Sequence, residues 1–438
     1  MFQTLINAFK NPEVRKKILI TIGLLILFRI GCWLPIPGLN VAGMGATESD
    51  SLLGLLSAVT GKALANGAFL AIGISPYINA SIIVQLLTVA IKKLEEWSKQ
   101  GDDGRKKINT VTRVVTFILA IVQAVGITIN WANSGGLDTA LFTGTFLAYP
   151  GVLGTMVAII LVAGSMFTMW LGDRITENGV GNGISLLIYI GILSTTGLSI
   201  IAVIQDMIAG SETAIWELLG FLLMAVLIFG FIVFVDLAER KIPVQYAKQI
   251  KGRKQYGGQS TFIPLKVNAS GVMPIIFSTA IITFPQLLGQ LFWNGTPFYI
   301  WWNDWMTPNG SNAWLYAIVV SLLILGFSYF YAQMQFNPEE VSRNIQQYGG
   351  FIPGIRPGAP TLDYLKKVTR RITFFGAVYL MIIALIPSVL FSIFSIGNAT
   401  LVNAMTSTGM LIIVSVALEF DKQLQSLMMM KHYKGFLK

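Results

Sequence analysis

The chain has 438 residues, of which 54% are hydrophobic and 12% charged, and it carries a formal net charge of +10. A soluble domain has about 25% charged residues, so this composition excludes a soluble globular protein. One cysteine, Cys32, and one histidine, His432, exclude an intramolecular disulfide and a Cys/His metal cluster.

The N-terminal segment has the charge pattern of a signal peptide, because residues 15–17 are three consecutive cations before an apolar stretch that begins at Ile18. The stretch continues through Trp33 without a small-x-small cleavage site. We therefore expect a retained first membrane span. Arg29 lies inside this span, either as a functional cation or, as we favour, as a side chain that snorkels outward or pairs with a carbonyl or an acid.

Ten apolar blocks follow one another along the chain, each long enough to cross about 30 Å of hydrocarbon at about 1.5 Å per residue. Their approximate limits are 18–35, 69–91, 111–131, 152–171, 184–204, 215–235, 271–292, 313–335, 371–394 and 400–421. The pattern predicts an all-α polytopic membrane protein. Ten spans divide as five plus five, and this parity is compatible with two inverted pseudo-symmetric halves, 1–205 and 206–438.

Lysine and arginine alternate between loops in the way that fixes membrane orientation. All of the 31 except Arg29 and Lys62 fall in, or within a few residues of, the N-terminal arm, the C-terminal tail, or the loops after the second, fourth, sixth and eighth blocks. Cytoplasmic loops carry such an excess of cations, so both termini are expected to be cytoplasmic. The net charge of +10 therefore has a topological explanation as well as a nucleic-acid one.

Three segments between the blocks have their own character. Residues 52–59 are apolar but too short to span, so they predict an interfacial or a re-entrant piece on the external side. The loop at about 239–268 alternates apolar and polar residues around glycines and predicts a protruding hairpin. The loop at about 337–368 is long and rich in proline and glycine.

The sequence gives little support to an enzyme or to an ion-coupled transporter. The run 179-GVGNG-183 lacks the Lys-Ser/Thr ending of a phosphate loop and opens a membrane span, so we interpret it as a cytoplasmic turn. No acidic residue lies near the centre of a block, whereas coupled transporters keep ionisable groups at the midplane. His432 lies on the tail, which leaves a buried serine hydrolase without a base.

Two sets of side chains recur at helical spacing. Ile78 and Ile82, and likewise Ile188 and Ile192, are four residues apart and share a helical face. Such pairs usually face lipid or core, and spacing alone does not assign them to a pore. The second and seventh spans hold polar groups that serve either ordinary helix packing or a seam that opens. These groups are Asn79, Ser81, Gln85, Ser278, Thr279 and Thr283.

Five long motifs together resemble the bacterial SecY family over essentially the whole chain. They are 27-LFRIGCWLPIPGLN-40, 71-AIGISPYINASIIVQLLT-88, 171-LGDRITENGVGNGIS-185, 245-QYAKQIKGRKQYGGQSTFIPLKVNASGVMP-274 and 337-NPEEVSRNIQQYGGFIPGIRPG-358. The resemblance implies a non-enzymatic protein-conducting channel without cofactor or metal. It would form an hourglass of two five-helix halves that moves unfolded preproteins across the bacterial plasma membrane.

The resemblance also implies roles for particular residues. The apolar pore ring would be Ile78, Ile82, Ile188, Ile192, Ile276 and Ile412. An external plug would occupy about 52–64, including Leu52, Leu53, Gly54, Leu55, Leu56 and Ser57. A lateral gate that releases membrane segments into the bilayer would include Asn79, Gln85, Gln123, Ser278 and Thr279. A narrow apolar ring dewets and resists ion flow, which makes the ring physically reasonable.

The same resemblance implies binding partners for the basic loops. Arg253, Lys254 and Arg356 would dock the SecA motor ATPase and the ribosome, the latter through rRNA phosphates. Small SecE-like and SecG-like membrane subunits, preprotein signal sequences and the lipid bilayer would be the other partners. A small-solute transporter, motivated by the five-plus-five parity, and an intramembrane enzyme are the alternatives. The first needs a polar midplane site and the second a catalytic constellation, and neither is evident in the sequence.

Overall fold

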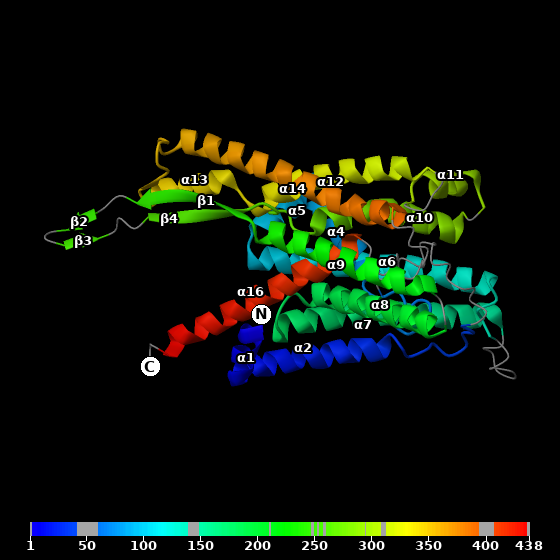
Figure 1. Cartoon of the computed structure of the whole chain (residues 1–438). Coiled ribbons are helices and arrows are strands. Elements are labelled where there is room, and N and C mark those ends of the chain that lie inside the picture. Colours follow the sequence, from blue (N-terminus) through cyan, green and yellow to red (C-terminus); the bar gives the residue numbers. More distant parts are fainter. Residues whose placement is uncertain are drawn as a thin grey trace. The chain divides into compact units, whose positions relative to one another are not determined.

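The computed structural model describes residues 2–41, 60–138, 149–209, 212–246, 249–251, 254–256, 260–293, 295–307, 312–393 and 407–435 (Figure 1). Each of the ten apolar blocks coincides with a helix. These helices are α2 (Pro12–Gly31), α4 (Ser75–Ala90), α6 (Asp102–Asn133), α7 (Pro150–Asn178), α8 (Gly183–Ile208), α9 (Glu212–Leu237), α10 (Met273–Phe292), α12 (Ala313–Gln335), α14 (Ala359–Ile393) and α16 (Ser407–Gly435).

Shorter elements lie between these helices. Within the described residues they are the helices α1 (Phe2–Lys10), α5 (Lys92–Lys99), α11 (Pro297–Trp305) and α13 (Pro338–Gln347), and the strands β1 (Glu239–Tyr246), β2 (Gln249–Lys251), β3 (Lys254–Tyr256), β4 (Ser260–Lys266) and β5 (Gly350–Phe351). All five strands come from the two long loops predicted to be cytoplasmic.

Length and composition mark many of the helices as membrane spans. Among the described residues six helices are long and apolar enough to cross a membrane, and α4 with α5 forms a further candidate that is bent by 100°. The six are Asp102–Asn133, Pro150–Asn178, Gly183–Ile208, Ile215–Leu237, Trp314–Gln347 and Ala359–Ile386. The chain is therefore a multi-pass membrane protein.

Several helices begin where a polar cap and a proline coincide. The Asn11 side chain accepts a hydrogen bond from the Glu13 backbone N–H at 3.3 Å, and proline follows Asn11 at the first helical position of α2. Asn337 does the same for Glu339 at 3.1 Å, again with proline following it in α13. A proline there loses no hydrogen bond, because the first N–H groups of a helix have no partner within the helix.

One predicted boundary is wrong. The apolar block 69–91 becomes helical only from Ser75, the start of α4, and the residues before it form turns. Pro76 occupies the first turn of the helix, and Gly73 has a φ of +58°, which ends any helix that approaches from the N-terminal side. Hydropathy alone does not distinguish a buried apolar turn from the helix that follows it.

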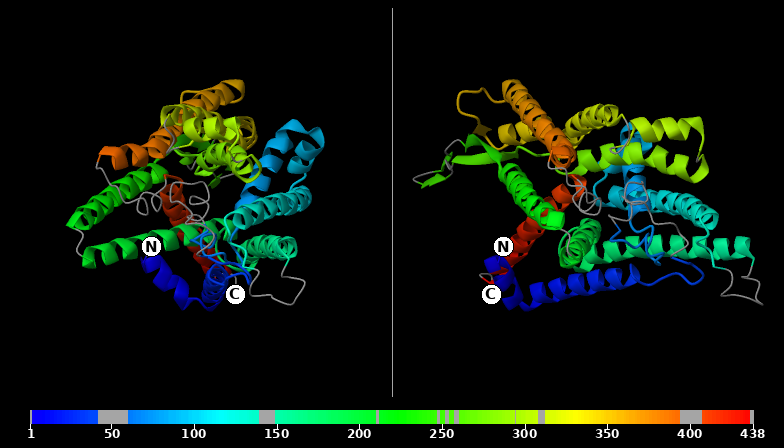
Figure 2. Two further views of the ribbon diagram at one scale, coloured as in Figure 1. Left: turned by 90° about the vertical axis from the view of Figure 1, so that its right-hand side faces the viewer. Right: turned by 45° about the vertical axis from the view of Figure 1, so that its right-hand side comes forward.

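The chain forms two compact units, and each is described by itself. The first contains residues 1–221, 283–304 and 394–438. In it α6 packs between α4 and α7, α7 packs against α8, and α8 packs against α16; α6 and α7 run side by side in both views of Figure 2. Its core surrounds the fully buried Trp131 and includes Ile36, Leu64 and Leu161.

The second unit contains residues 222–282 and 305–393. Here α12 packs along α14, and a three-stranded antiparallel sheet has the order β4-β1-β5. The predicted hairpin is confirmed, because β1 and β4 pair in continuous register from Glu239 opposite Lys266 to Gln245 opposite Ser260. The expected halves, 1–205 and 206–438, concern pseudo-symmetry rather than packing, and they stay a prediction.

Candidate functional site

The predicted ring residues of the first unit lie on α4, α8 and α16. Ile188 and Ile192, on one face of α8, are 8% and 6% exposed. Ile412 is 6% exposed on α16, the helix that packs against α8. Ile82 is 4% exposed on α4, and Ile78 is half-buried on the same helix. Ile276, half-buried on α10, belongs to the second unit.

The predicted plug divides at the edge of the described residues. Residues 52–59, which include all six side chains assigned to the plug, lie outside them. The chain from Thr60 to Ile74 is described and is largely buried, with Ala63, Ala68 and Leu70 fully inside. A Cβ on Gly164 of α7 would overlap the carbonyl oxygen of Phe69, so the backbone approaches α7 as closely as a glycine allows. The segment 60–74 thus enters the helix bundle of this unit.

The candidate gate residues differ in how their polar groups are satisfied. Ser278 and Thr279 on α10 donate to carbonyls of their own helix, at 2.6 Å to Pro274 and 2.9 Å to Ile275. This i−4 bonding is common for hydroxyls in membrane helices and needs no other partner. Gln85 of α4 donates to Ser81 at 3.3 Å, and Asn79 is half-buried on the same helix.

Gln123 has the most unusual environment among the candidate gate residues. It is 2% exposed on α6, the helix against which α4 packs, and its Nε2 has no hydrogen-bond partner. An unpaired buried amide costs about 1–3 kcal/mol. The polar seam predicted from the sequence therefore contains one group whose hydrogen-bonding capacity is not used in this conformation.

The glycine-rich run after α7 has a structural role. A Cβ on Gly183 would overlap the carbonyl oxygen of Gly172, and a Cβ on Gly179 would overlap Oγ1 of Thr21. The Val180 N–H donates to that same Thr21 Oγ1 at 3.0 Å. Gly179 lets the turn between α7 and α8 pack closely on α2, and Gly183 lets the start of α8 pack closely on α7, which agrees with interpreting 179–183 as a turn.

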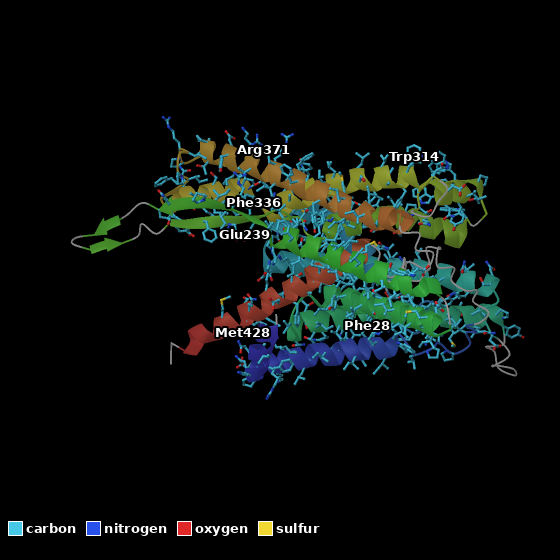
Figure 3. The ribbon with its side chains drawn as sticks, in the orientation of Figure 1. Phe28, Glu239, Trp314, Phe336, Arg371 and Met428 are labelled. Carbon is cyan, nitrogen blue, oxygen red and sulfur yellow. The ribbon has the colours of Figure 1, made fainter. Side chains whose placement is uncertain are left out.

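The two long loops form one folded platform in the second unit. Strand β5 of the later loop pairs antiparallel with β1 of the earlier one, Gln245 opposite Phe351 and Tyr246 opposite Gly350. Apolar side chains from the sheet, α13 and the start of α14 share one core beneath it, namely Ile242, Val244, Leu265, Ile345, Ile352, Leu365 and Val368. Phe336, at the end of α12, packs against this core, and Figure 3 labels it together with Glu239, the first residue of β1.

The base of the platform is tied to the helices. The Asn268 side chain, after β4, donates to the Asp236 carboxylate of α9 at 2.8 Å. The Val267 N–H donates to the Ala238 carbonyl at 3.0 Å. A Cβ on Gly376 of α14 would lie 2.6 Å from the Val267 carbonyl oxygen, so α14 approaches the hairpin at a glycine. These contacts hold the base of the β1–β4 hairpin against α9 and α14.

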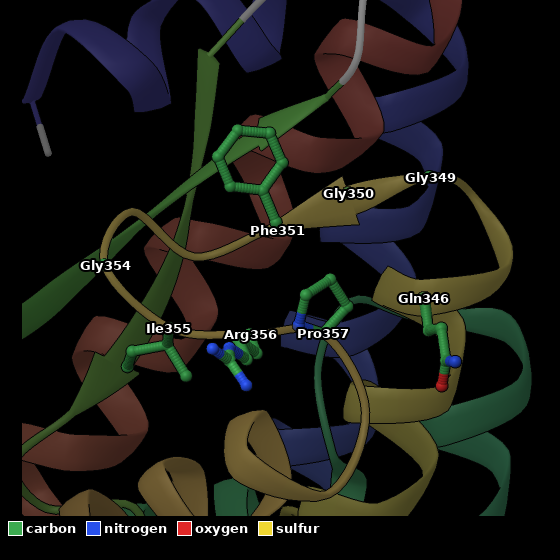
Figure 4. Close-up of a pocket in the computed structure, with 8 residues that line it drawn as sticks. All are labelled: Gln346, Gly349, Gly350, Phe351, Gly354, Ile355, Arg356 and Pro357. Carbon is green, nitrogen blue, oxygen red and sulfur yellow. The ribbon is translucent and has the colours of Figure 1, made fainter.

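A pocket of about 540 Å³ opens on the platform between the end of α13, β5 and the turn into α14 (Figure 4). Its lining residues are Gln346, Gly349, Gly350, Phe351, Gly354, Ile355, Arg356 and Pro357. Arg356 is exposed, while its carbonyl accepts from Thr361 Oγ1 at 2.8 Å. Gly354 and Gly358, with φ of +84° and +95°, shape the turn around it.

Of the other two docking candidates, the structure describes Lys254. Lys254 begins β3 opposite Lys251 of β2, and Arg253 lies outside the described residues. The structure adds aromatic residues that sequence reasoning missed. Tyr348 is 76% exposed beside β5, and the Lys241 ammonium lies 4.8 Å from the ring centroid of exposed Phe262. A strand as short as β5 gives no periodic signal, so the sequence could not place these side chains on one surface.

Comparison with known proteins places the chain in one family. The family model described as SecY matches residues 68–420. The protein translocase subunit SecY of Halalkalibacterium halodurans is 40% identical over 450 residues, and that of Streptomyces coelicolor 41% identical over 448, each match covering 100% of both chains. The subunit of Thermotoga maritima is 39% identical over 453 residues, covering 100% of this chain and 98% of its own.

Solved structures show the same fold. A protein-conducting channel superposes with a TM-score of 0.66 at 20% identity, covering 96% of each chain. Sec61, from a canine ribosome-channel complex of the endoplasmic reticulum, superposes with a TM-score of 0.61 at 19% identity, also over 96% of each chain. The shared fold defines the class, an all-α polytopic membrane protein. The chain belongs to the SecY family.

Proposed function

We propose that this chain is the pore subunit that moves unfolded preproteins across the bacterial plasma membrane. The observation that carries the proposal is the isoleucine face of α8: Ile188 and Ile192 are buried there, and α8 packs against α16, which carries the buried Ile412. With Ile78, Ile82 and Ile276 they form the apolar ring. A ring of branched apolar side chains excludes water and ions yet can spread around a passing chain.

The plug and the lateral gate complete the seal. Residues at about 52–64, including Leu52–Ser57, form the plug in this proposal, and the buried course of 60–74 supports an external segment that enters the bundle. Asn79, Gln85, Gln123, Ser278 and Thr279 lie along the gate. Its opening exposes a nascent apolar helix to lipid, where burial of its own side chains drives release.

The cytoplasmic platform is the docking surface for the machines that supply the polypeptide. Arg253, Lys254 and Arg356 contact the ribosome through rRNA phosphates, or the SecA motor ATPase. The shared core of the two loops supports this role, because it holds basic and aromatic side chains on a folded surface. SecE-like and SecG-like subunits accompany the chain in this proposal. Both of its termini are cytoplasmic. Its two halves, 1–205 and 206–438, are related by pseudo-symmetry.

The decisive test is translocation of a preprotein into proteoliposomes that contain this chain, its small subunits and SecA. We expect ATP-dependent protection of the preprotein from external protease. Absence of protection, together with saturable uptake of a small solute by the chain alone, would replace the channel with a transporter.

Ion conductance across planar bilayers tests the seal itself. Ile192→Ala should raise the resting conductance, because truncation widens the apolar constriction and lets water enter. The matched control is Ile201→Ala on the same helix, whose side chain is 52% exposed and is expected to face lipid. A variant lacking 52–59 should also leak. Equal, low conductance in all of these proteins would remove the ring and the plug from the proposal.

A further inference from the structure

Arg29 is a cation in the last turn of α2, within the first membrane-spanning block. The carbonyl end of a helix favours a positive charge, which offsets part of the cost of placing it there. The Arg29 Nη1 is nevertheless buried and has no hydrogen-bond partner. The sequence led us to expect that Arg29 reaches solvent or pairs with a carbonyl or an acid. Its Nη1 does neither.

The guanidinium lies against the backbone of Gly61. A Cβ built on Gly61 would overlap Arg29 Nη1, would lie 3.3 Å from Arg29 Cζ and would lie 3.4 Å from the Gly191 carbonyl oxygen of α8. Arg29 thus occupies the space that the missing side chain of Gly61 leaves. The contact brings together α2, α8 and the C-terminal part of the segment predicted as the plug, about 52–64.

The segment at this contact has an unfavourable backbone conformation. Gly61 has a φ of +70°, and the next residue, Lys62, has a φ of +67°. Lys62 is the one residue other than glycine with a positive φ in the described parts of the chain. A lysine in the left-handed region is strained, and such strain persists only where the surroundings hold it.

Hydrogen bonds continue the segment into the core. The Asn66 N–H donates to the Lys62 carbonyl at 3.0 Å, and the Ala68 N–H donates to the Ala63 carbonyl at 3.0 Å. Ala63 and Leu64 are buried, and Leu64 belongs to the core around Trp131. Residues 60–68 are therefore an ordered turn whose N-terminal edge is strained and in contact with an incompletely paired cation.

We infer that Arg29 is a positioning residue that holds the turn 60–68 in its buried place through its contact with Gly61, as a latch that can be released. The guanidinium fills the space beside Gly61 and keeps the turn against α8. The unpaired Nη1 and the strained Lys62 both raise the free energy of the latched conformation. The turn 60–68 is therefore ordered, but the free-energy cost of its latched conformation lets it open.

Hydrogen–deuterium exchange of the full-length chain in lipid nanodiscs tests the latch. Arg29→Met should accelerate exchange of the amides in 60–68 by roughly tenfold, because methionine lacks the guanidinium that fills the space beside Gly61. Peptides from 172–186, where the turn rests on Thr21 and glycines, should exchange as in the parent. Unchanged exchange in 60–68 would overturn the latch.

Two further variants keep the test decisive. Arg29→Lys retains the charge without the planar guanidinium and should accelerate 60–68 less than methionine does. If Arg29→Met accelerates exchange in every peptide, the Arg29→Lys variant decides the test. Faster exchange confined to 60–68 in Arg29→Lys supports the latch, and unchanged exchange there overturns it. Lys62→Gly removes the strain and should slow exchange in 60–68 by a few-fold, and faster exchange would contradict the strained turn.

The latch rests on the proposed function, since it would set how readily the C-terminal part of the proposed plug moves. The exchange measurement requires no preprotein and no ion current. Failure of the latch and failure of the proposed channel are therefore separate outcomes.

Discussion

Tyr246 of β1 and Gly350 of β5 are direct partners in an antiparallel pair, and this pair joins two loops that lie far apart in sequence. A Cβ on Gly350 would lie 2.9 Å from Cε1 of Tyr246 and 3.2 Å from Cγ2 of Ile345. We expect Gly350→Val to destabilise the platform by about 1–3 kcal/mol, the usual cost of overpacking a core. Limited proteolysis at 345–358 should become faster, and SecA or ribosome binding should weaken with it.

Gly349→Val is not a suitable control, because Gly349 has a φ of +67° and any side chain there is strained. Tyr348→Ala removes a 76% exposed side chain next to the same strand without crowding the core. It should leave the proteolysis rate unchanged. If Tyr348→Ala and Gly350→Val open the loop equally, crowding between β1 and β5 is not the cause.

Thr21 fixes the turn between α7 and α8 through one buried hydrogen bond, from the Val180 N–H at 3.0 Å. Thr21→Val keeps the shape and removes the acceptor, so a buried N–H loses its partner at a cost of about 1–3 kcal/mol. Thermal unfolding in detergent should shift to lower temperature. Thr110→Val is the matched control, since exposed Thr110 bonds only its own helix at Lys106. An equal shift in both variants would show that the Val180 bond contributes nothing.

The sequence predicted the helices well because a membrane span must be both apolar and long. It did not predict how far some helices extend beyond their apolar blocks. α6 begins at Asp102, α14 begins at Ala359 and α16 reaches Gly435, all through charged segments. Lysine, arginine and glutamate are good helix formers, so the helix continues where the apolar pattern stops.

The candidate site was predictable only in part. Helical spacing placed Ile188 and Ile192 on one face, and that face is buried. The contact of Arg29 with Gly61 joins segments distant in sequence, so no local pattern signals it. The core shared by the two long loops was likewise missed, because it depends on a two-residue strand, Gly350–Phe351, that is paired with β1.

Arg113 of α6 and Asp173 of α7 form an ion pair at 2.6 Å between two adjacent helices. Their side chains are 52% and 30% exposed, so solvent screens the attraction. A double-mutant cycle with Arg113→Met and Asp173→Asn should give a coupling energy of about 0.2–1 kcal/mol that decreases at high salt. The free energy of unfolding in detergent is the measurement. A coupling that stays constant between low and high salt would indicate a packing contact instead.

Glu339 in the first turn of α13 accepts a hydrogen bond from Lys366 of α14 at 2.9 Å, and this bond with the lysine charge lowers the pKa of the carboxyl below its usual 4.5. A lowered folded-state pKa stabilises the folded platform above pH 4.5, and this contribution is lost as the pH falls through the folded pKa. Glu339→Gln should therefore speed proteolysis of the α13 region at pH 7, and its difference from the parent should vanish in more acidic solution than pH 4.5. Glu340→Gln, which removes a carboxylate from the same helical turn, is the matched control for the helix dipole. A difference between parent and Glu339→Gln that persists unchanged into strong acid would show that the carboxylate–lysine bond does not stabilise the platform.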